Sequence, residues 1–400
     1  MSWEKVKLND ICSSIYDGDH NAPPKSDTGV PFVTISNIDA ADGSIDFSNT
    51  AHVPNSYFES LKPERKPRPG DVLYSVVGSF GIPSLVKDQK PFVFQRHVAI
   101  LRPNDRIEPE YLYYSMKSRN FYHWADSVAI GAAQRTVTLG QLREKTIALP
   151  PLPVQSRIAG VLSAHDKLIE NNRKQIKLLE EAAQRLYKEW FVDLRFPGHE
   201  TTPIHNGIPE GWKRTTVGEI ASVNAKSLKA SELPRMISYI DLSCASMGHI
   251  LSVSQYSAQD APGRARRVAR DGSIAWGMVR PSQQSYCLVR HPSPSTVLST
   301  GFAVIDAQAV PFSFLYETLA QNSFVSYLVG LTNGSTYPAV KPEHFYNAEV
   351  VTPDEKTLSR FDAAVLPILN GIELREQQIV AAREARDRLL PKLMSGEIEV

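Results

Sequence analysis

The sequence is poor in the residues that build disulfides, metal sites and membrane spans. Its three cysteines, Cys12, Cys244 and Cys287, lie far apart and lack metal-ligand spacing. Free thiols in a reducing compartment are therefore expected. No apolar run is long enough to cross a membrane, and the first residues lack the features of a signal peptide. These absences predict a cytoplasmic protein.

The chain also lacks an excess of charge of either sign. It carries 44 Lys and Arg residues against 43 Asp and Glu residues, a formal net charge of +1. Any nucleic-acid binding would therefore have to come from local basic patches, because the molecule as a whole is nearly neutral. With 400 residues, of which 42% are hydrophobic, the chain is large enough for two or three cores.

Motifs of the common nucleic-acid enzymes are missing as well. There is no GxxxxGK[ST] phosphate loop, so no ATP-driven motor is encoded. The Pro-Pro pairs at 23–24 and 150–151 lack the flanking residues of a methyltransferase loop. Residues 353–356, Pro-Asp-Glu-Lys, superficially resemble a nuclease motif, but these groups crowd the start of a helix. No catalytic residue is predicted.

Residues 17–20, Asp-Gly-Asp-His, are the one cluster of metal-ligand types in the sequence. Four such residues in a turn more often cap the chain locally, and no second ligand group follows at the spacing that metal sites need. The sequence therefore predicts no metal site.

What the sequence does contain is a long helix with one apolar seam. Over residues 158–190 apolar side chains recur at alternating steps of four and three, with charged residues between them. At 1.5 Å per residue this helix would be about 50 Å long. The same rhythm returns 203 positions later, so the chain carries the helix twice. We expect the seams to pack as an antiparallel coiled coil through Ile158, Leu162, Ile169, Asn172, Ile176, Leu179, Leu186, Phe361, Val365, Ile372, Arg375, Ile379, Leu389 and Leu393.

Three residues bear on the register and the ends of these helices. With the seam centres aligned, Asn172 would lie beside Arg375, and a polar pair in a seam sets register at some cost in stability. Alternatively, both side chains simply reach solvent. Pro367 should kink or split the second helix. Asp354 is well placed to cap its N-terminus.

The segments that precede the two helices also match each other. The shift of 203 maps Gly131 onto Gly334, and a shift of 209 maps Trp3 onto Trp212. Each segment contains short β-rich runs between Gly, Pro and Asn turns, and one helix, at 108–126 or 311–330. The runs expected to form strands are residues 30–36, 71–77, 83–87, 92–102, 235–243, 272–279, 285–291 and 299–307.

The predicted fold class is α/β (α+β), with two similar globular domains that contain twisted β-sheets. Two long helices, packed as an antiparallel coiled coil, separate the domains and give the chain pseudo-two-fold symmetry. The expected boundaries are 1–150 for the first globular domain, 151–196 for the first helix, 197–353 for the second globular domain and 354–400 for the second helix.

Several motifs together resemble the specificity subunit of Type I restriction-modification systems. They are WEKVKLNDI and WKRTTVGEI at the start of each half, residues 131–169 with their echo at 334–372, and the closing LLPKLMSGEI at 389–398. The resemblance covers the whole chain, in the order target recognition domain, conserved helix, target recognition domain, conserved helix. It implies a non-catalytic DNA-binding protein in which each recognition domain reads one half of a bipartite double-stranded DNA site.

The resemblance also implies partners for this chain. The helices would set the half-site spacing and dock two methyltransferase (M) subunits, and restriction (R) subunits would join the full complex. S-adenosylmethionine, ATP and Mg would belong to those subunits, and none to this chain. The alternative is a coiled-coil scaffold with two globular protein-binding ends and no DNA role.

Candidate DNA-binding residues lie in basic clusters and beside Gly- or Ser-rich turns. Basic clusters suffice for phosphate contacts, whereas base edges need bidentate groups, Arg for guanine and Asn or Gln for adenine. For any single candidate base reader, a solvated surface role is the simpler alternative. The basic clusters are Lys62, Arg65, Lys66 and Arg68, and Arg264, Arg266, Arg267 and Arg270. The candidate base readers are Arg96, Gln134, Arg135, Arg280, Gln283, Gln284 and Tyr337.

Overall fold

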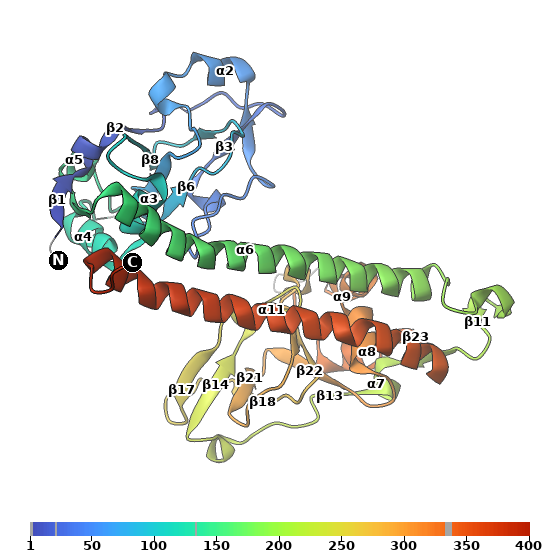
Figure 1. The fold of residues 1–400 in the computed structure, drawn as a ribbon. Coiled ribbons are helices and arrows are strands. Elements are labelled where there is room, and N and C mark those ends of the chain that lie inside the picture. The colour runs from blue at the N-terminus through green and yellow to red at the C-terminus, as the bar shows by residue number, and fades with distance from the viewer. Residues whose placement is uncertain (1–2, 21, 133, 333–337) are drawn as a thin grey trace. The chain divides into compact units, whose positions relative to one another are not determined.

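The computed structural model describes residues 3–20, 22–132, 134–332 and 338–400 of the chain. It divides into two compact units, Met1–Asn171 with Gln378–Val400, and Asn172–Gln377. Each unit contains one globular domain and part of each of the two longest helices, α6 (Leu152–Tyr187) and α11 (Glu355–Ser395) (Figure 1). Among the described residues, no helix combines the length and the apolar character needed to span a bilayer.

The globular part of the first unit contains two main sheets. A four-stranded antiparallel sheet has the order β2-β8-β5-β6, and a three-stranded sheet has the order β4-β3-β7. The short strands β1 and β9 pair with each other, which fixes the start of the chain beside the residues that lead into α6. The strands are β1 (Glu4–Lys7), β2 (Cys12–Asp17), β3 (Val30–Val33), β4 (Ala51–Val53), β5 (Val72–Ser75), β6 (Pro83–Leu85), β7 (Val93–Phe94), β8 (Val98–Pro103) and β9 (Thr146–Leu149). The helices are α1 (Leu8–Ile11), η1 (Ile35–Asn37), α2 (Asn55–Ser60), η2 (Pro63–Arg65), α3 (Pro109–Lys117), α4 (Arg119–Val128) and α5 (Leu139–Glu144).

The second unit begins within α6, which ends in a π-helical turn, η3 (Lys188–Val192). A short connection follows, with η4 (His199–Thr201), β10 (Ile204–His205) and β11 (Ile208–Pro209). The strands of its globular part are β12 (Lys213–Thr216), β13 (Ala221–Val223), β14 (Met236–Ile240), β15 (Ala245–Ser246), β16 (His249–Ile250), β17 (Ser254–Ser257), β18 (Ala265–Val268), β19 (Ser273–Gly277), β20 (Tyr286–Val289), β21 (Thr296–Ser299), β22 (Phe302–Ala307) and β23 (Glu349–Thr352). Its other helices are α7 (Val217–Ile220), η5 (Ala230–Glu232), η6 (Leu242–Cys244), η7 (Pro281–Gln283), α8 (Phe312–Leu319), α9 (Asn322–Gly330) and α10 (Pro342–Tyr346).

The two globular domains share one topology. The sheet β13-β22-β19-β20 repeats the order of β2-β8-β5-β6, and β12 pairs with β23 as β1 pairs with β9. In the smaller sheets, β14 pairs with β21 in parallel and with β17 antiparallel, as β3 pairs with β7 and β4. The second domain adds β18 at the edge next to β21. The predicted duplication and the mixed helix-and-sheet fold are confirmed.

The central strands β5 and β19 are buried on both faces, because each lies between helices and a second sheet. Side chains alternate between the two faces of a strand. Val72 and Tyr74 accordingly belong to the core formed with the helices, whereas Leu73 packs with Val33 and Phe94 of the smaller sheet. In β19, Trp276 faces the helix-side core and Ala275 faces the opposite core.

In each unit, α6 and α11 run antiparallel. In the first unit, Arg157 bonds to the carbonyl of Val400 and Asp166 to Arg386, so the partner number falls as α6 advances. In the second unit, Gln175 bonds to Arg375, and Tyr187 packs edge-on against Phe361. The seam residues are buried or half-buried along both helices.

The contacts of the seam centre differ from the expected register. The Nε atom of Arg375 donates to Gln175 Oε1 at 2.5 Å and its Nη1 atom donates to the carbonyl of Gly371 at 2.9 Å. Asn172 lies about one turn away from Gln175 on α6. Its side chain is 3% exposed, so it does not reach solvent, and its Nδ2 atom has no partner among the described residues.

Some predicted elements are interrupted by turns. The helix expected at 108–126 is two helices, because Ser118 is extended and its hydroxyl accepts a hydrogen bond from Phe121 N. The helix expected at 311–330 divides into α8 and α9. The run 92–102 forms β7 and β8 around a turn in which Val98 N donates to the Gln95 carbonyl. Each remaining run contains a strand shorter than the run itself or, at 299–307, the end of β21 and all of β22.

Pro367 does not split the second long helix, since α11 is assigned as one helix from Glu355 to Ser395. Pro367 and Ala363 are both exposed, so water can bond to the carbonyl that loses its usual donor. Asp354 caps the helix as predicted: its Oδ1 atom accepts a hydrogen bond from Thr357 N at 3.0 Å.

Candidate nucleic-acid interface

One end of the four-stranded sheet gathers the candidate base readers of the first domain. Val76 N donates to the His97 carbonyl at 2.8 Å, and Gly78 N donates to the Arg135 carbonyl at 3.0 Å. These bonds join three segments: the turn between β5 and β6, the turn before β8, and residues 130–137. They bring together Arg96, Gln134 and Arg135, which are all exposed.

The guanidinium of Arg135 is already engaged in the first domain. Its Nη1 atom lies 2.5 Å from Asp126 Oδ1, and its Nη2 atom donates to the Asp126 carbonyl. The guanidinium also lies 5.4 Å from the ring centre of Phe80, which stacks on Tyr122. Arg135 would therefore have to exchange these partners to contact a base. Phe80 was not among the sequence candidates, and its place beside two glycines in an exposed turn is the signal that could have identified it.

The second domain repeats this arrangement at the turn between β19 and β20. Arg280 N donates to the Pro338 carbonyl at 2.8 Å, as Gly78 N donates to Arg135. Arg280 and Gln283 are exposed and Gln284 is half-buried, so the structure brings these three candidates together. Tyr337 lies outside the described residues.

The backbone of this second turn is unusual. Arg280 has φ 50° and ψ 64°, and Gln284 has φ 51° and ψ 42°, both in the left-handed region. At the matching positions the first domain has Gly78 with φ 71° and Gly81 with φ 96°. Glycine adopts this conformation freely, whereas other residues pay a steric cost.

A cavity of about 380 Å³ opens beside the same turn. Arg280 and Gln283 line it with Val279 and Ser285, and Leu242 and Ser243 of η6 form the rest of its wall. The tip of the β15–β16 hairpin lies next to the turn, because Met247 N donates to the Gln284 carbonyl at 3.0 Å. The residues of η6 and of this hairpin were not among the sequence candidates, because only the tertiary fold brings them to the turn.

The first basic cluster is only partly available. Arg65 contacts Asp17 at 3.8 Å and Asp19 at 3.7 Å. Lys66 donates to the Glu59 carbonyl at 2.9 Å. The remaining two members, Lys62 and Arg68, are exposed. The Asp-Gly-Asp-His segment therefore contacts a cation of the protein, and Tyr57 also donates to Asp19, at 3.1 Å.

The second basic cluster lies on and around β18. Arg267 donates to the Ser227 hydroxyl at 2.7 Å, and Arg270 lies 3.2 Å from Asp306. Arg266 donates to the carbonyl of Ala265. Arg264 is exposed, and its carbonyl accepts a hydrogen bond from Thr300 N. This bond places Arg264 next to the β21–β22 turn, on the side of the sheet where Met278 N bonds to Gly301.

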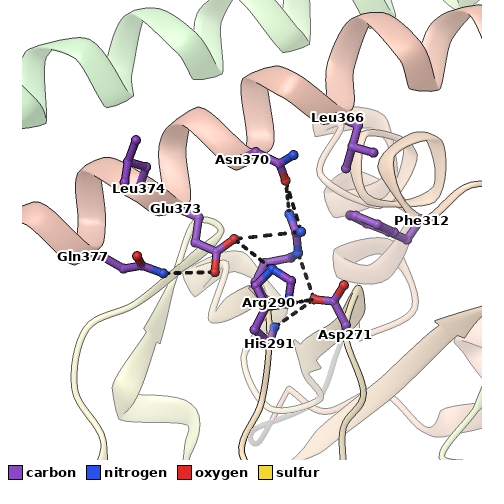
Figure 2. A pocket seen from close by; sticks show the side chains of 9 residues that line it. All are labelled: Asp271, Arg290, His291, Phe312, Leu366, Asn370, Glu373, Leu374 and Gln377. Atoms are coloured by element: carbon purple, nitrogen blue, oxygen red, sulfur yellow. Dashed lines mark hydrogen bonds and ion pairs between the residues drawn. The ribbon is translucent and has the colours of Figure 1, made fainter.

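A polar cluster attaches the other end of β20 to α11. Figure 2 shows Arg290 between Asp271 and residues of α11. Its Nε atom lies 3.0 Å from Asp271 Oδ1, and both terminal nitrogens lie 3.1 Å from Asn370 Oδ1. Glu373 lies 3.9 Å away. These residues line a cavity beside α11. Because they pair with one another, we assign the cluster a structural role.

His249 makes a second attachment between the same domain and the long helices. Its Nε2 atom lies 2.8 Å from Glu180 of α6, and its Nδ1 atom lies 2.7 Å from Glu376 of α11. Hydrogen bonds to Glu180 and Glu376 raise the pKa of His249 to about 10. The imidazolium is therefore charged at neutral pH and fixes β16 to both helices within this unit.

The comparisons with known proteins all match the same kind of protein. Residues 1–181 match the family model described as the Type I restriction modification DNA specificity domain. The Type I restriction enzyme MjaIX specificity subunit of Methanocaldococcus jannaschii is 24% identical over 349 residues, which cover 83% of this chain and 78% of that protein. The putative Type I restriction enzyme MjaX specificity subunit of the same organism is 30% identical over 225 residues, 54% of this chain and 52% of that protein.

A solved structure extends the likeness to the whole fold. The crystal structure of the S subunit of a Type I restriction-modification system from M. genitalium superposes with a TM-score of 0.61. The superposition covers 98% of this chain and 96% of that chain, at 15% sequence identity. At this identity the likeness establishes a shared fold.

Proposed function

We propose that the chain is a specificity subunit of a Type I restriction-modification system, in which each globular domain reads one half of a bipartite DNA target. The observation that carries the proposal is the shared topology of the two domains, each with polar candidate base readers at the same end of its four-stranded sheet. Duplex DNA has local two-fold symmetry, so two similar readers related by such an axis meet two half-sites in equivalent ways.

In this proposal the long helices set the distance between the half-sites. The 36 residues of α6 span about 54 Å at 1.5 Å per residue. Half-sites one helical turn of DNA apart are separated by about 34–36 Å. A pair of helices of this length is long enough to hold two readers at that separation.

In this proposal partner subunits carry out methylation and cleavage of the DNA. Two methyltransferase subunits dock on the helices, restriction subunits join them, and this chain supplies recognition without catalysis. S-adenosylmethionine, ATP and Mg are assigned to those subunits, and the complex works in the cytoplasm. A scaffold without a DNA role would leave the match to a DNA specificity domain unexplained.

Exchange of one domain tests the proposal. Residues 211–352 would be replaced by the second recognition domain of another specificity subunit, and the chain would be expressed with its methyltransferase partner. We expect methylome sequencing to show a bipartite motif in which one half changes and the other stays. A change in both halves, or a wild-type chain that directs no bipartite motif, would contradict the proposal. Methylation by the purified chain alone would contradict its non-catalytic role.

A further inference from the structure

We propose that Arg280 is the residue that specifies a guanine in the half-site read by the second recognition domain. This inference rests on the proposed function, because it assigns one base contact within that domain. Three independent features carry it: the backbone conformation at Arg280, the availability of its side chain, and the cavity that it lines.

Arg280 has a left-handed backbone conformation, which arginine adopts at a steric cost. The duplicate domain has Gly78 at the matching position. Both residues donate their backbone N–H to the same neighbouring segment, to Pro338 or to Arg135. The turn is therefore the same, and glycine would form it without strain. A strained residue that the surrounding fold maintains is a reason to look for a function of its side chain.

Gln284 is left-handed as well, but its strain has a structural explanation. Its carbonyl accepts the N–H of Met247, and its own N–H donates to Pro281, so it closes the turn and joins it to the β15–β16 hairpin. Its matching residue, Gly81, has room for a side chain only if the ring of Tyr122 moves, because a Cβ atom there would lie 2.6 Å from that ring. In contrast, a Cβ atom at Gly78 would meet nothing within 4 Å. The two domains thus differ at Arg280 by a side chain that the turn does not need.

The guanidinium of Arg280 is available for a ligand. The residue is exposed, and among the described residues its side chain makes no hydrogen bond or ion pair. Several other candidate arginines are engaged, among them Arg135 with Asp126, Arg267 with Ser227 and Arg270 with Asp306. In the second domain Arg264 is exposed like Arg280, but it does not line the cavity. A guanidinium presents a planar fork of donors that matches the N7 and O6 acceptors of guanine in the major groove.

The cavity beside Arg280 is lined by both polar and apolar side chains. Gln283 and Ser285 add hydrogen-bonding groups to the wall, and Leu242 and Val279 add apolar surface. A base edge needs this combination, because polar groups select the acceptor pattern and apolar groups contact the rest of the base. Arg280 at the rim of the cavity can reach an edge that approaches it.

Arg280→Gly separates this role from a structural one. The change removes the side chain and the backbone strain together, so we expect a melting temperature equal to or above that of the wild type. In cells that express the chain with its methyltransferase partner, methylome sequencing should show one guanine position of the second half-site relaxed to other bases. The first half-site should be unchanged. Discrimination at that position should fall about 10- to 100-fold, as expected for one lost bidentate contact.

His291→Gly is the matched control. His291 is exposed and left-handed, with φ 44°, and lies at the opposite end of β20. The change relieves the same kind of strain, and the methylation motif should stay as in the wild type. The same relaxation in His291→Gly as in Arg280→Gly would overturn the proposal.

Arg280→Lys distinguishes a base contact from a phosphate contact. Lysine keeps the positive charge but loses the planar fork, so the motif should relax as it does in Arg280→Gly while the salt dependence of binding to the wild-type site stays the same. If lysine preserves the wild-type motif, Arg280 acts as a charge and the proposal fails. An unchanged motif in Arg280→Gly, or a change confined to the first half-site, would also overturn it. If the wild-type chain directs no bipartite motif, the proposed function itself fails.

Discussion

Glu317 in α8 is a buried carboxyl group in the second unit. Its side chain is 2% exposed, and its Oε2 atom lacks a hydrogen-bond partner among the described residues. Burial, and then the nearby carboxylate of Glu180, raise the pKa of Glu317 to about 8. The carboxyl group is therefore largely protonated in the folded protein at neutral pH.

This shift predicts that stability falls as the pH rises. The pKa of Glu317 has its ordinary value of 4.5 in the unfolded chain and rises to about 8 in the folded chain. Between these values the folded state binds more protons, so each pH unit lowers the free energy of unfolding, by about 1.4 kcal/mol at most. Glu317→Gln should flatten the dependence of the melting temperature on pH between 5 and 8. It should stabilise the protein by about 1–3 kcal/mol at pH 8.

The control for this prediction is Glu210→Gln, a change of an exposed residue in the connection before the second domain. Its melting profile against pH should follow that of the wild type. If Glu317→Gln also follows the wild type, the carboxyl group of Glu317 is not protonated in the folded state.

At the scale of single elements, Arg386 links α11 to α6 in the first unit. Its side chain is 3% exposed and lies 2.5 Å from Asp166 and 2.7 Å from Asp387. Tyr114 donates to the other carboxylate oxygen of Asp166 at 2.7 Å. Removal of one partner leaves the other partly buried and unpaired, which costs more than the pair itself contributes.

We therefore expect Arg386→Ala to lower the free energy of unfolding by about 2–4 kcal/mol, as measured by denaturant titration. Arg388→Ala is the matched control two residues further along, because Arg388 is 81% exposed and its contact with Glu384 is long, at 3.6 Å. The control should change the free energy of unfolding by less than about 0.5 kcal/mol. Equal effects of the two changes would show that burial of Arg386 is unimportant.

The sequence predicted these long helices because their seam positions, which are mostly apolar, repeat with the same spacing over many turns. It did not predict the break at Ser118, since the choice between a continuous helix and a new N-cap depends on how the following turn packs. Arg375 pairs with Gln175 and not with Asn172, the expected partner three residues earlier. Periodicity alone does not fix this shift of one helix along the other.

The candidate site also could be predicted only in part from the sequence. Arg96 and Gln134 lie at one end of the sheet in the first domain, and Arg280 lies at the matching turn of the second domain. Their contact with bases stays a prediction. The sequence could not reveal that Arg135 is paired with Asp126, or that Arg280 matches Gly78, because both facts depend on hydrogen bonds between distant segments.

At the scale of the whole molecule, the proposed spacing role of the helices predicts the effect of a length change. Seven residues inserted near Gln175 of α6, together with seven near Arg375 of α11, would add two turns to both helices and about 10.5 Å to their length. At 3.4 Å per base pair this corresponds to about three base pairs. Methylome sequencing should therefore show a longer spacer with both half-sites unchanged.

The control is the same insertion in α6 alone, which shifts its seam against α11 and should lower the melting temperature and methylation. An unchanged spacer in a stable and active double insertion would contradict the role of the helices in spacing.

The three cysteines have a practical consequence for spectroscopy. Cys12, Cys244 and Cys287 are all buried, and burial raises the thiol pKa of Cys12 and of Cys287 to about 12. Thiolates are the reactive form, so maleimide dyes should leave the folded wild-type chain almost unlabelled. Two surface cysteines, one engineered into each globular domain, would then take donor and acceptor fluorophores with little background. Single-molecule energy transfer could then measure whether the distance between the domains changes when DNA is added.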